Sequence, residues 1–192
     1  IAKGSPNLGA GVGSGDGVNS GDVIVNGGEL DATGGSGAAG IGGGEYGMNG
    51  TVTINSGTVT ATSTGSGAGI GTGGFLGSGT PGDVHLNGGT VTATGGDAAA
   101  AIGGGKFDAA PNLTVADGAD VTVANGGDSS AFGVGGSFSD PGNTYGPTQI
   151  DIAGTVHLDH AAFLSDNTTT TIELTGVLDG TGSLTGSTQV VN

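Results

Sequence analysis

The sequence contains no cysteine and no tryptophan, and only 2 lysine or arginine residues stand against 17 aspartate or glutamate residues. Without cysteine there is neither a disulfide framework nor a thiol nucleophile, which is compatible with secretion by a bacterium. The formal net charge of -15 repels phosphate backbones, so we expect no binding to nucleic acid. No apolar run approaches the roughly 18 residues that cross a bilayer, so we expect no membrane insertion. The first residues lack the apolar stretch of a signal peptide, and we expect a mature or excised fragment.

Aromatic residues are also scarce, at 4% of the chain, whereas glycine accounts for 48 of its 192 residues. A conventional globular core is hard to build from this composition, but a thin core of small and β-branched residues is not. Glycine does not occur at every third position, which excludes collagen. The glycine content therefore indicates either a disordered tract or a repeat that turns at regular intervals, and periodicity decides between them.

A block of alternating small and aliphatic residues recurs with a period of roughly 30 residues, at residues 10–13, 39–42, 68–71, 100–103 and 132–135. Two further apolar alternations follow in a fixed order, and alternation with period two is typical of a half-buried strand. In the first unit they pair Val23 with Val25 and Leu30 with Ala32. No segment sustains the apolar spacing of an amphipathic helix. Three short strands per unit predict an all-β fold, a right-handed parallel β-helix or β-solenoid.

In a solenoid each strand pairs with its equivalent one coil away, about 4.8 Å along the axis, so inward residues stack in columns. Such columns predict a narrow, dry interior with little room for a ligand. We expect one domain over residues 1–192, with regular coils at about 9–136 and irregular, widened coils and a cap at about 137–192. One predicted column holds Ala10, Ala39, Ala68, Ala100 and Phe132, and the next holds Val12, Ile41, Ile70, Ile102 and Val134.

Residues 67–71, Gly-Ala-Gly-Ile-Gly, and residues 88–96, Gly-Gly-Thr-Val-Thr-Ala-Thr-Gly-Gly, resemble the glycine-rich tandem repeats of large bacterial surface and wall-associated proteins. This resemblance covers roughly residues 9–136 and implies a β-helical fold and an extracellular or cell-surface location. The Asn-Gly-Gly corners at residues 26–28 and 87–89 are also similar to those of pectate-lyase-like β-helices. No motif of those enzymes matches, so no catalytic residue is carried over.

Catalysis needs convergent titratable groups, and the chain offers few candidates. It has no Gly-x-Ser-x-Gly elbow and no His-Glu-x-x-His motif. His85 alternates with two apolar residues and is predicted to face solvent. The cluster of His157, Asp159 and His160 is the alternative, as a metal or acid/base site whose third ligand the spacing does not identify. We expect no enzymatic activity and no cofactor, with Ca²⁺ left open.

Repeated outward aspartates are the reason for leaving Ca²⁺ open, because carboxylates and turn carbonyls are its preferred ligands. Asp22 and Asp83 occupy equivalent positions, as do approximately Asp97 and Asp128, which follow Gly-Gly pairs. The other interpretation, which we expect to hold, is that these carboxylates keep a repetitive β surface soluble and discourage edge-to-edge aggregation.

Outward threonines form a second candidate surface. We define the threonine array as the outward threonines of two adjacent units, which Thr33 and Thr122 extend. Such Thr-x-Thr rows resemble the ice-binding face of some insect antifreeze solenoids, and ice binding is therefore an alternative function. Ordinary β-propensity is the competing explanation. The array consists of Thr58, Thr60, Thr62, Thr90, Thr92 and Thr94.

Aromatic residues in the inserts after the glycine blocks form a third candidate surface. They are predicted to gather on one edge of the solenoid, where exposed rings are able to stack on sugars, so a carbohydrate-binding module is another alternative. The competing explanation is that the rings fold over the coil and pin their loops. The residues are Tyr46, Phe75, Phe107, Phe138 and Tyr145.

Taken with the resemblance, these observations predict a non-catalytic structural stalk or adhesion surface. Its expected partners are a polysaccharide or another surface protein, and its ends are predicted to stack coil on coil or to adjoin neighbouring domains.

Overall fold

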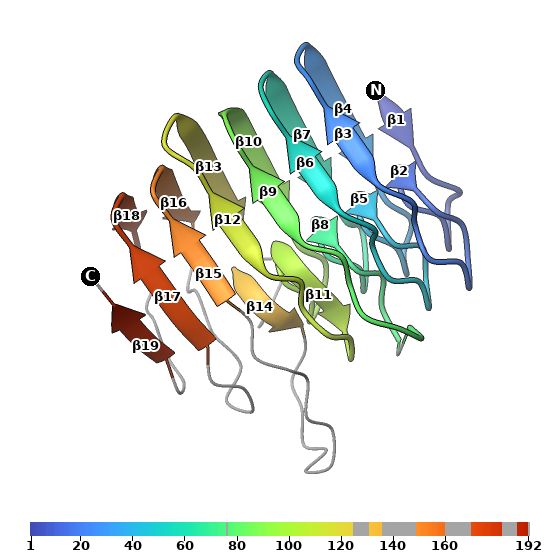
Figure 1. The fold of residues 1–192 in the computed structure, drawn as a ribbon. Coiled ribbons are helices and arrows are strands. Elements are labelled where there is room, and N and C mark those ends of the chain that lie inside the picture. The colour runs from blue at the N-terminus through green and yellow to red at the C-terminus, as the bar shows by residue number, and fades with distance from the viewer. Residues whose placement is uncertain (76, 125–130, 136–148, 160–169, 182–187, 192) are drawn as a thin grey trace.

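The computed structural model describes residues 1–75, 77–124, 131–135, 149–159, 170–181 and 188–191. Every regular element in these segments is a strand, and the strands wind into a parallel β-solenoid with three strands per coil (Figure 1). The predicted all-β solenoid is therefore confirmed. The described residues include no helix long and apolar enough to cross a membrane.

Three parallel sheets run along the solenoid. Each coil contributes one strand to each sheet as far as β14, and the later described strands, β15 to β19, belong to sheets C and A. Sheet A consists of β1 (Ala2–Lys3), β4 (Glu29–Thr33), β7 (Thr58–Thr62), β10 (Gly89–Thr94), β13 (Ala119–Ala124), β16 (Thr155–Asp159) and β18 (Val177–Gly180). Sheet B consists of β2 (Val12–Gly13), β5 (Ile41–Gly42), β8 (Ile70–Gly71), β11 (Ile102–Lys106) and β14 (Phe132–Gly135). Sheet C consists of β3 (Val23–Val25), β6 (Val52–Ile54), β9 (Val84–Leu86), β12 (Leu113–Val115), β15 (Gln149–Ile152), β17 (Thr170–Leu174) and β19 (Thr188–Val191).

The interior follows from the period-two alternation of the strands. In β6, Val52 and Ile54 are fully buried while Thr53 between them is half-buried on the outer face. Each fully buried aliphatic side chain of this size contributes roughly 1.5–3 kcal/mol to folding. Like residues stack on like, because the strands pair in register from coil to coil. The first sheet C column holds Val23, Val52, Val84, Leu113 and Ile150.

Two predicted columns are wrong at their last member, Phe132 in the alanine column and Val134 in the aliphatic column. Phe132 pairs with Ile102 in sheet B and is 4% exposed, so it occupies the aliphatic column rather than the alanine column. The preceding residue, Ala131, accepts the backbone hydrogen bond of Ile102 at 3.0 Å. A phenyl ring needs the volume that a branched aliphatic residue fills, and the alanine column does not provide it. The register of this coil is therefore displaced by two residues from the prediction, which put Val134 beside Ile102.

The corner between sheets C and A is turned in the same way in successive coils. Asn55 Nδ2 donates to Asn26 Oδ1 at 2.8 Å, and Asn87 Nδ2 donates to Asn55 Oδ1 at 2.8 Å. Gly57, which completes one of these corners, has a φ of 102°, a conformation that glycine adopts without steric cost. The predicted Asn-Gly corners are thus confirmed as turns, and they are joined into an amide ladder.

Glycine in the repeated block has a different cause, which is the close approach of neighbouring coils in sheet B. Gly71 has a φ of 139°, and a Cβ atom built on it would lie 1.9 Å from the carbonyl oxygen of Gly103. No side chain fits in that space. The block therefore repeats glycine because the sheet B backbones leave no room for anything larger.

Candidate functional site

The threonine array lies on the outer face of sheet A, at the positions the sequence predicts. Strands β7 and β10 pair so that Thr58, Thr60 and Thr62 stand directly beside Thr90, Thr92 and Thr94. Val59 and Ala61 between them point inward and are fully buried. The outward side chains are spaced about 4.8 Å between coils and about 6.6 Å along a strand, as the geometry of parallel strands requires.

Charged residues border the array on both sides along the solenoid axis. Glu29 and Asp31 of β4 pair with Thr58 and Thr60, so two carboxylates precede the array. Asp120 of β13 pairs with Thr90 and follows it. The array is therefore an uncharged patch, carrying hydroxyl and methyl groups, with carboxylates on both sides of it along the axis.

The aromatic row, which we define as Tyr46, Phe75 and Phe107, lies on the edge between sheets B and C. The ring centroids of Tyr46 and Phe75 are 6.1 Å apart, and those of Phe75 and Phe107 are 6.0 Å apart. The rings are tilted against each other by 39° and 58°. Tyr46 is 49% exposed, while the two phenylalanines are half-buried. These three residues gather on one edge as predicted, and Phe138 and Tyr145 lie outside the described residues.

The backbone of the aromatic row is left-handed in all three coils. The φ angles of Tyr46, Phe75 and Phe107 are 58°, 72° and 70°. A bulky residue in this region carries a conformational cost of about 1–2 kcal/mol, and glycine is the residue that normally occupies it. Tyr46 N donates to Gly74 O at 2.9 Å and Phe75 N donates to Lys106 O at 2.7 Å, so the conformation is held from coil to coil.

Two charged side chains lie next to the aromatic row. The ammonium nitrogen of Lys106 is 5.2 Å from the centroid of the Phe107 ring, within range of a cation–π interaction. Glu45 precedes Tyr46, and burial raises the pKa of its carboxyl group, with a further contribution from the negative charge of Asp16. A hydrogen bond with the side chain of Tyr46 opposes this rise.

The aspartates considered for Ca²⁺ are not brought together. Asp22 Oδ1 accepts a hydrogen bond from Thr51 N at 2.9 Å, and Asp83 Oδ1 accepts one from Asn112 Nδ2 at 3.1 Å. The register of sheet C places a whole coil between Asp22 and Asp83, which separates them by about 9.6 Å along the axis. One ion does not reach both carboxylates at the 2.3–2.6 Å that is typical of Ca²⁺ ligands.

The second aspartate pair is described only in part. Asp97 is exposed, and Asp128 lies outside the described residues. Within the segments that the structure describes, no group of three His, Cys, Asp or Glu side chains is arranged to hold a metal ion.

His157 makes contacts that the sequence did not predict. Asp159 is on the same outward face of β16, as expected. The carboxylates that contact the imidazole, however, come from the coils on either side: Nε2 lies 3.2 Å from Asp120 Oδ1 and Nδ1 lies 2.5 Å from Asp179 Oδ1. The hydrogen bond with Asp179 is the main reason that the pKa of His157 is raised, and both aspartate charges add to it. His160 lies outside the described residues. The imidazole thus links three coils on the outer face of sheet A.

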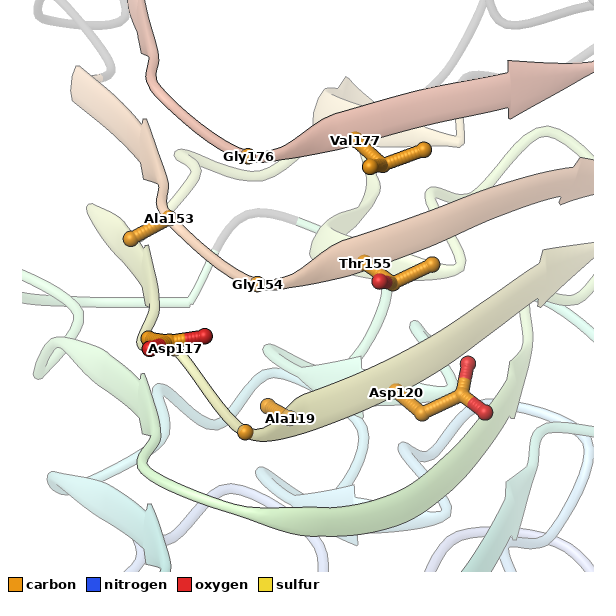
Figure 2. Close-up of a pocket in the computed structure, with 9 residues that line it drawn as sticks. Asp117, Ala119, Asp120, Ala153, Gly154, Thr155, Gly176 and Val177 are labelled. Carbon is orange, nitrogen blue, oxygen red and sulfur yellow. The ribbon is translucent and has the colours of Figure 1, made fainter.

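A shallow groove lies at the corner between sheets C and A, close to His157. Figure 2 shows Asp120, Thr155 and Val177 on three successive coils on one side of it and Asp117 and Ala153 on the other. Its volume is about 360 Å³, and its two titratable lining residues are both aspartates. The sequence did not predict this groove, because nothing in the motif of a single corner indicates that three corners form a concave surface.

Asp108 is a buried acid in the loop after the aromatic row. Its side chain is 1% exposed, and both carboxylate oxygens accept from Gly77 N, at 2.9 and 3.1 Å. Burial raises its pKa to about 6, although hydrogen bonds from Gly77 and Ala109 oppose the shift. A lone aspartate in a variable insert gave no sequence signal for this environment.

The comparison with known protein families follows the coils of the solenoid. Residues 23–45, 52–74 and 84–106 each begin at a strand of sheet C and end just before a residue of the aromatic row. These three segments match the family model described as a beta helix repeat. In them the chain is similar to beta helix repeats. One such repeat corresponds to one coil of the solenoid, and the aromatic row follows directly after the matched residues. No curated protein and no solved structure matches the chain.

Proposed function

We propose that this chain is a non-catalytic module of an extracellular bacterial protein, where it serves as a structural stalk or an adhesion surface. The observation that carries this proposal is the unbroken in-register pairing of parallel strands along sheets A and C. A stack of similar coils, each bonded to its neighbours, makes a rigid support whose faces are set at fixed positions.

The stalk role is supported by the way in which coils are joined. Backbone hydrogen bonds link the sheets from coil to coil, and they are reinforced by the Asn26, Asn55 and Asn87 ladder. The columns of Val, Ile and Leu continue through the same coils, so these coils contact each other through apolar side chains as well as through polar groups. Such continuity resists bending, because bending would open both the ladder and the core.

The adhesion role is supported by the outer face of sheet A. The threonine array is uncharged and pairs residue by residue between two coils, and a regular lattice of hydroxyl groups suits contact with an extended surface. We expect beads coated with the protein to be retained on at least one of three test surfaces: hydroxylated silica, cellulose film and an epithelial cell layer.

A pair of matched variants tests this use of sheet A. Thr60→Lys with Thr92→Lys places two long charged side chains in the centre of the array and is expected to lower bead retention at least tenfold. Thr53→Lys with Thr114→Lys makes the same chemical change on the outer face of sheet C and should leave retention unchanged. Retention on none of the surfaces, or an equal loss in both variants, contradicts an adhesive sheet A.

The non-catalytic part of the proposal has its own measurement. The protein is incubated with a panel of soluble polysaccharides, and reducing ends and unsaturated products are assayed. We expect no turnover. Product formation that is lost in His157→Gln would overturn the proposal, since His157 with its two aspartates is the densest titratable cluster in the described residues. Antibody labelling of intact cells that produce the parent protein tests the extracellular location.

A second candidate function, ice binding, is favoured by the exact pairing of the two Thr-x-Thr rows in β7 and β10. A flat, regular array of hydroxyl and methyl groups is the kind of surface on which water is able to order. In an ice-recrystallisation assay, this function predicts inhibition that is lost in Thr60→Tyr and in Thr92→Tyr and kept in Thr53→Tyr. Absence of inhibition by the unaltered protein rejects it.

A further inference from the structure

We propose that the aromatic row is a binding site for a single chain of a neutral polysaccharide, which lies along the solenoid axis. The row is on the edge between sheets B and C, whereas the adhesion surface proposed above is on sheet A. The inference therefore goes beyond that proposal and does not depend on it.

The direction of the ligand follows from the placement of the rings. Each of three successive coils contributes one ring, and neighbouring centroids are 6.1 and 6.0 Å apart, so the row extends from coil to coil along the solenoid. A pyranose ring is similar in size to a six-membered aromatic ring, and linked sugar rings present their apolar faces at regular intervals. A linear glycan is the ligand whose repeat is able to follow such a row.

The backbone conformation is the second, independent observation. Tyr46, Phe75 and Phe107 are all held at positive φ, in a chain that places glycine at many other left-handed positions. Glycine there would turn the chain without strain. Strain of this kind is typically found at sites where a side chain has a use that outweighs its conformational cost. Holding the loop in place does not by itself require a strained residue in each of three successive coils.

The tilts of the rings specify the form of the ligand. Successive planes differ by 39° and 58°, so the three rings do not form one flat platform. A crystalline polysaccharide face needs a flat platform, whereas a single glycan chain is free to twist from one sugar to the next. Tyr46 has the most exposed ring, with 49% of its surface accessible, and is therefore the principal contact.

The charges around the row select a neutral polymer. Lys106, one of only 2 lysine or arginine residues in the sequence, is placed over the Phe107 ring, while Glu45 lies beside Tyr46. With a net charge of -15, the protein repels polymers of uronic acids or sulfated sugars. Glu45 and Lys106 supply an acceptor and a donor for sugar hydroxyl groups.

The test uses affinity gel electrophoresis and titration calorimetry with soluble neutral glucans, mannan and xylan, with polygalacturonate as the acidic polymer and crystalline cellulose as the flat surface. The unaltered protein is expected to bind at least one neutral soluble polymer. Tyr46→Gly removes the ring and relieves the positive φ, so it should weaken binding at least tenfold while the melting temperature stays equal or rises.

Two further variants separate binding from folding. Ala98→Gly relieves a positive φ of 56° in another loop, and it should leave binding unchanged. Tyr46→Leu keeps an apolar contact for Phe75 but lacks a flat face, so it should lose binding without a change in melting temperature. Retained binding in both Tyr46 variants overturns the proposal in favour of loop pinning.

Failure of the unaltered protein to bind any neutral soluble polymer also overturns the proposal, as does a preference for polygalacturonate or for crystalline cellulose. These outcomes leave the bead assay on sheet A unaffected, so the two proposals fail separately.

Discussion

His157 Nδ1 lies 2.5 Å from Oδ1 of Asp179, a residue that follows it by 22 positions and belongs to the next coil of sheet A. On the opposite side of the ring, Nε2 faces Asp120 of the preceding coil. A protonated imidazole between two carboxylates binds the last described coils of sheet A to those before them.

The pH dependence of this contact is the first prediction. The pKa of His157 is raised in the folded protein, chiefly by Asp179. Its stabilising contribution is therefore present below the ordinary histidine pKa of 6.5 and is lost as the pH rises through the folded pKa. The side chain is 43% exposed, and exposed ion pairs contribute only about 0.2–1 kcal/mol. Thermal unfolding measured from pH 6 upward should show a small loss of stability. His157→Gln should abolish that loss, and His85→Gln, on sheet C, should preserve it.

Asp108 gives a second prediction in a lower pH window. Its pKa rises from 3.8 to about 6 on folding, so between these values the folded protein holds more protons than the unfolded chain. The free energy of unfolding therefore falls as the pH rises from about 4 to about 6, by roughly 2–3 kcal/mol at most. Urea unfolding across this range should show the decline, and Asp108→Asn should flatten it. A decline that persists in Asp108→Asn but vanishes in the variant of the exposed Asp97, Asp97→Asn, would contradict the prediction, because it would show that Asp108 is not the carboxylate responsible.

The close approach of Gly71 to Gly103 gives a third prediction. Gly71→Ala places a methyl group 1.9 Å from a backbone oxygen at a φ of 139°, so the sheet B strands must separate. We expect a loss of several kcal/mol or failure to fold, because the obstacle is backbone and does not rotate away. A Cβ atom built on Gly15 would have no other atom within 4 Å. Gly15→Ala should therefore change stability by less than about 1 kcal/mol. Equal melting temperatures for the two variants would show that sheet B tolerates wider spacing.

Calcium provides a fourth prediction. Asp22 and Asp83 are each used in hydrogen bonds to an adjacent coil and are separated by one whole coil. Excess chelator should therefore leave the melting curve unmoved, whereas a ligand that binds the folded state alone would raise the melting temperature with its concentration. A chelator-sensitive transition that Asp97→Asn abolishes would restore a calcium site at the loop of that residue.

The sequence predicts the sheets well where the spacing of the repeat is constant. Val52 and Ile54 could be placed inside and Thr53 outside, because alternation with period two leaves no other choice once one face is buried. The first error occurs at Phe132, where a block that reads like the earlier ones is displaced by two residues. Local similarity does not determine register when a large ring competes with small residues for the same column.

The contacts of His157 were not predictable for a related reason. Its partners are set by pairing between coils, and the separation of 22 residues from Asp179 departs from the period of roughly 30 residues on which the prediction relied. Asp159, only two residues away, was the natural candidate from sequence. Register across an irregular coil depends on loop length and packing, which residue spacing does not show.

The Gly71 and Gly103 contact has a consequence for how such a chain changes length. The coils of Gly13, Gly42, Gly71 and Gly103 meet their neighbours with the same glycine spacing and the same column of Val or Ile residues in sheet B. Deleting residues 52–83 would bring Val84 onto Val23 in place of Val52, with the first sheet C column still aliphatic throughout. A gene could therefore gain or lose coils by in-frame duplication or deletion, and the reach of the module would be adjusted in steps of about 4.8 Å.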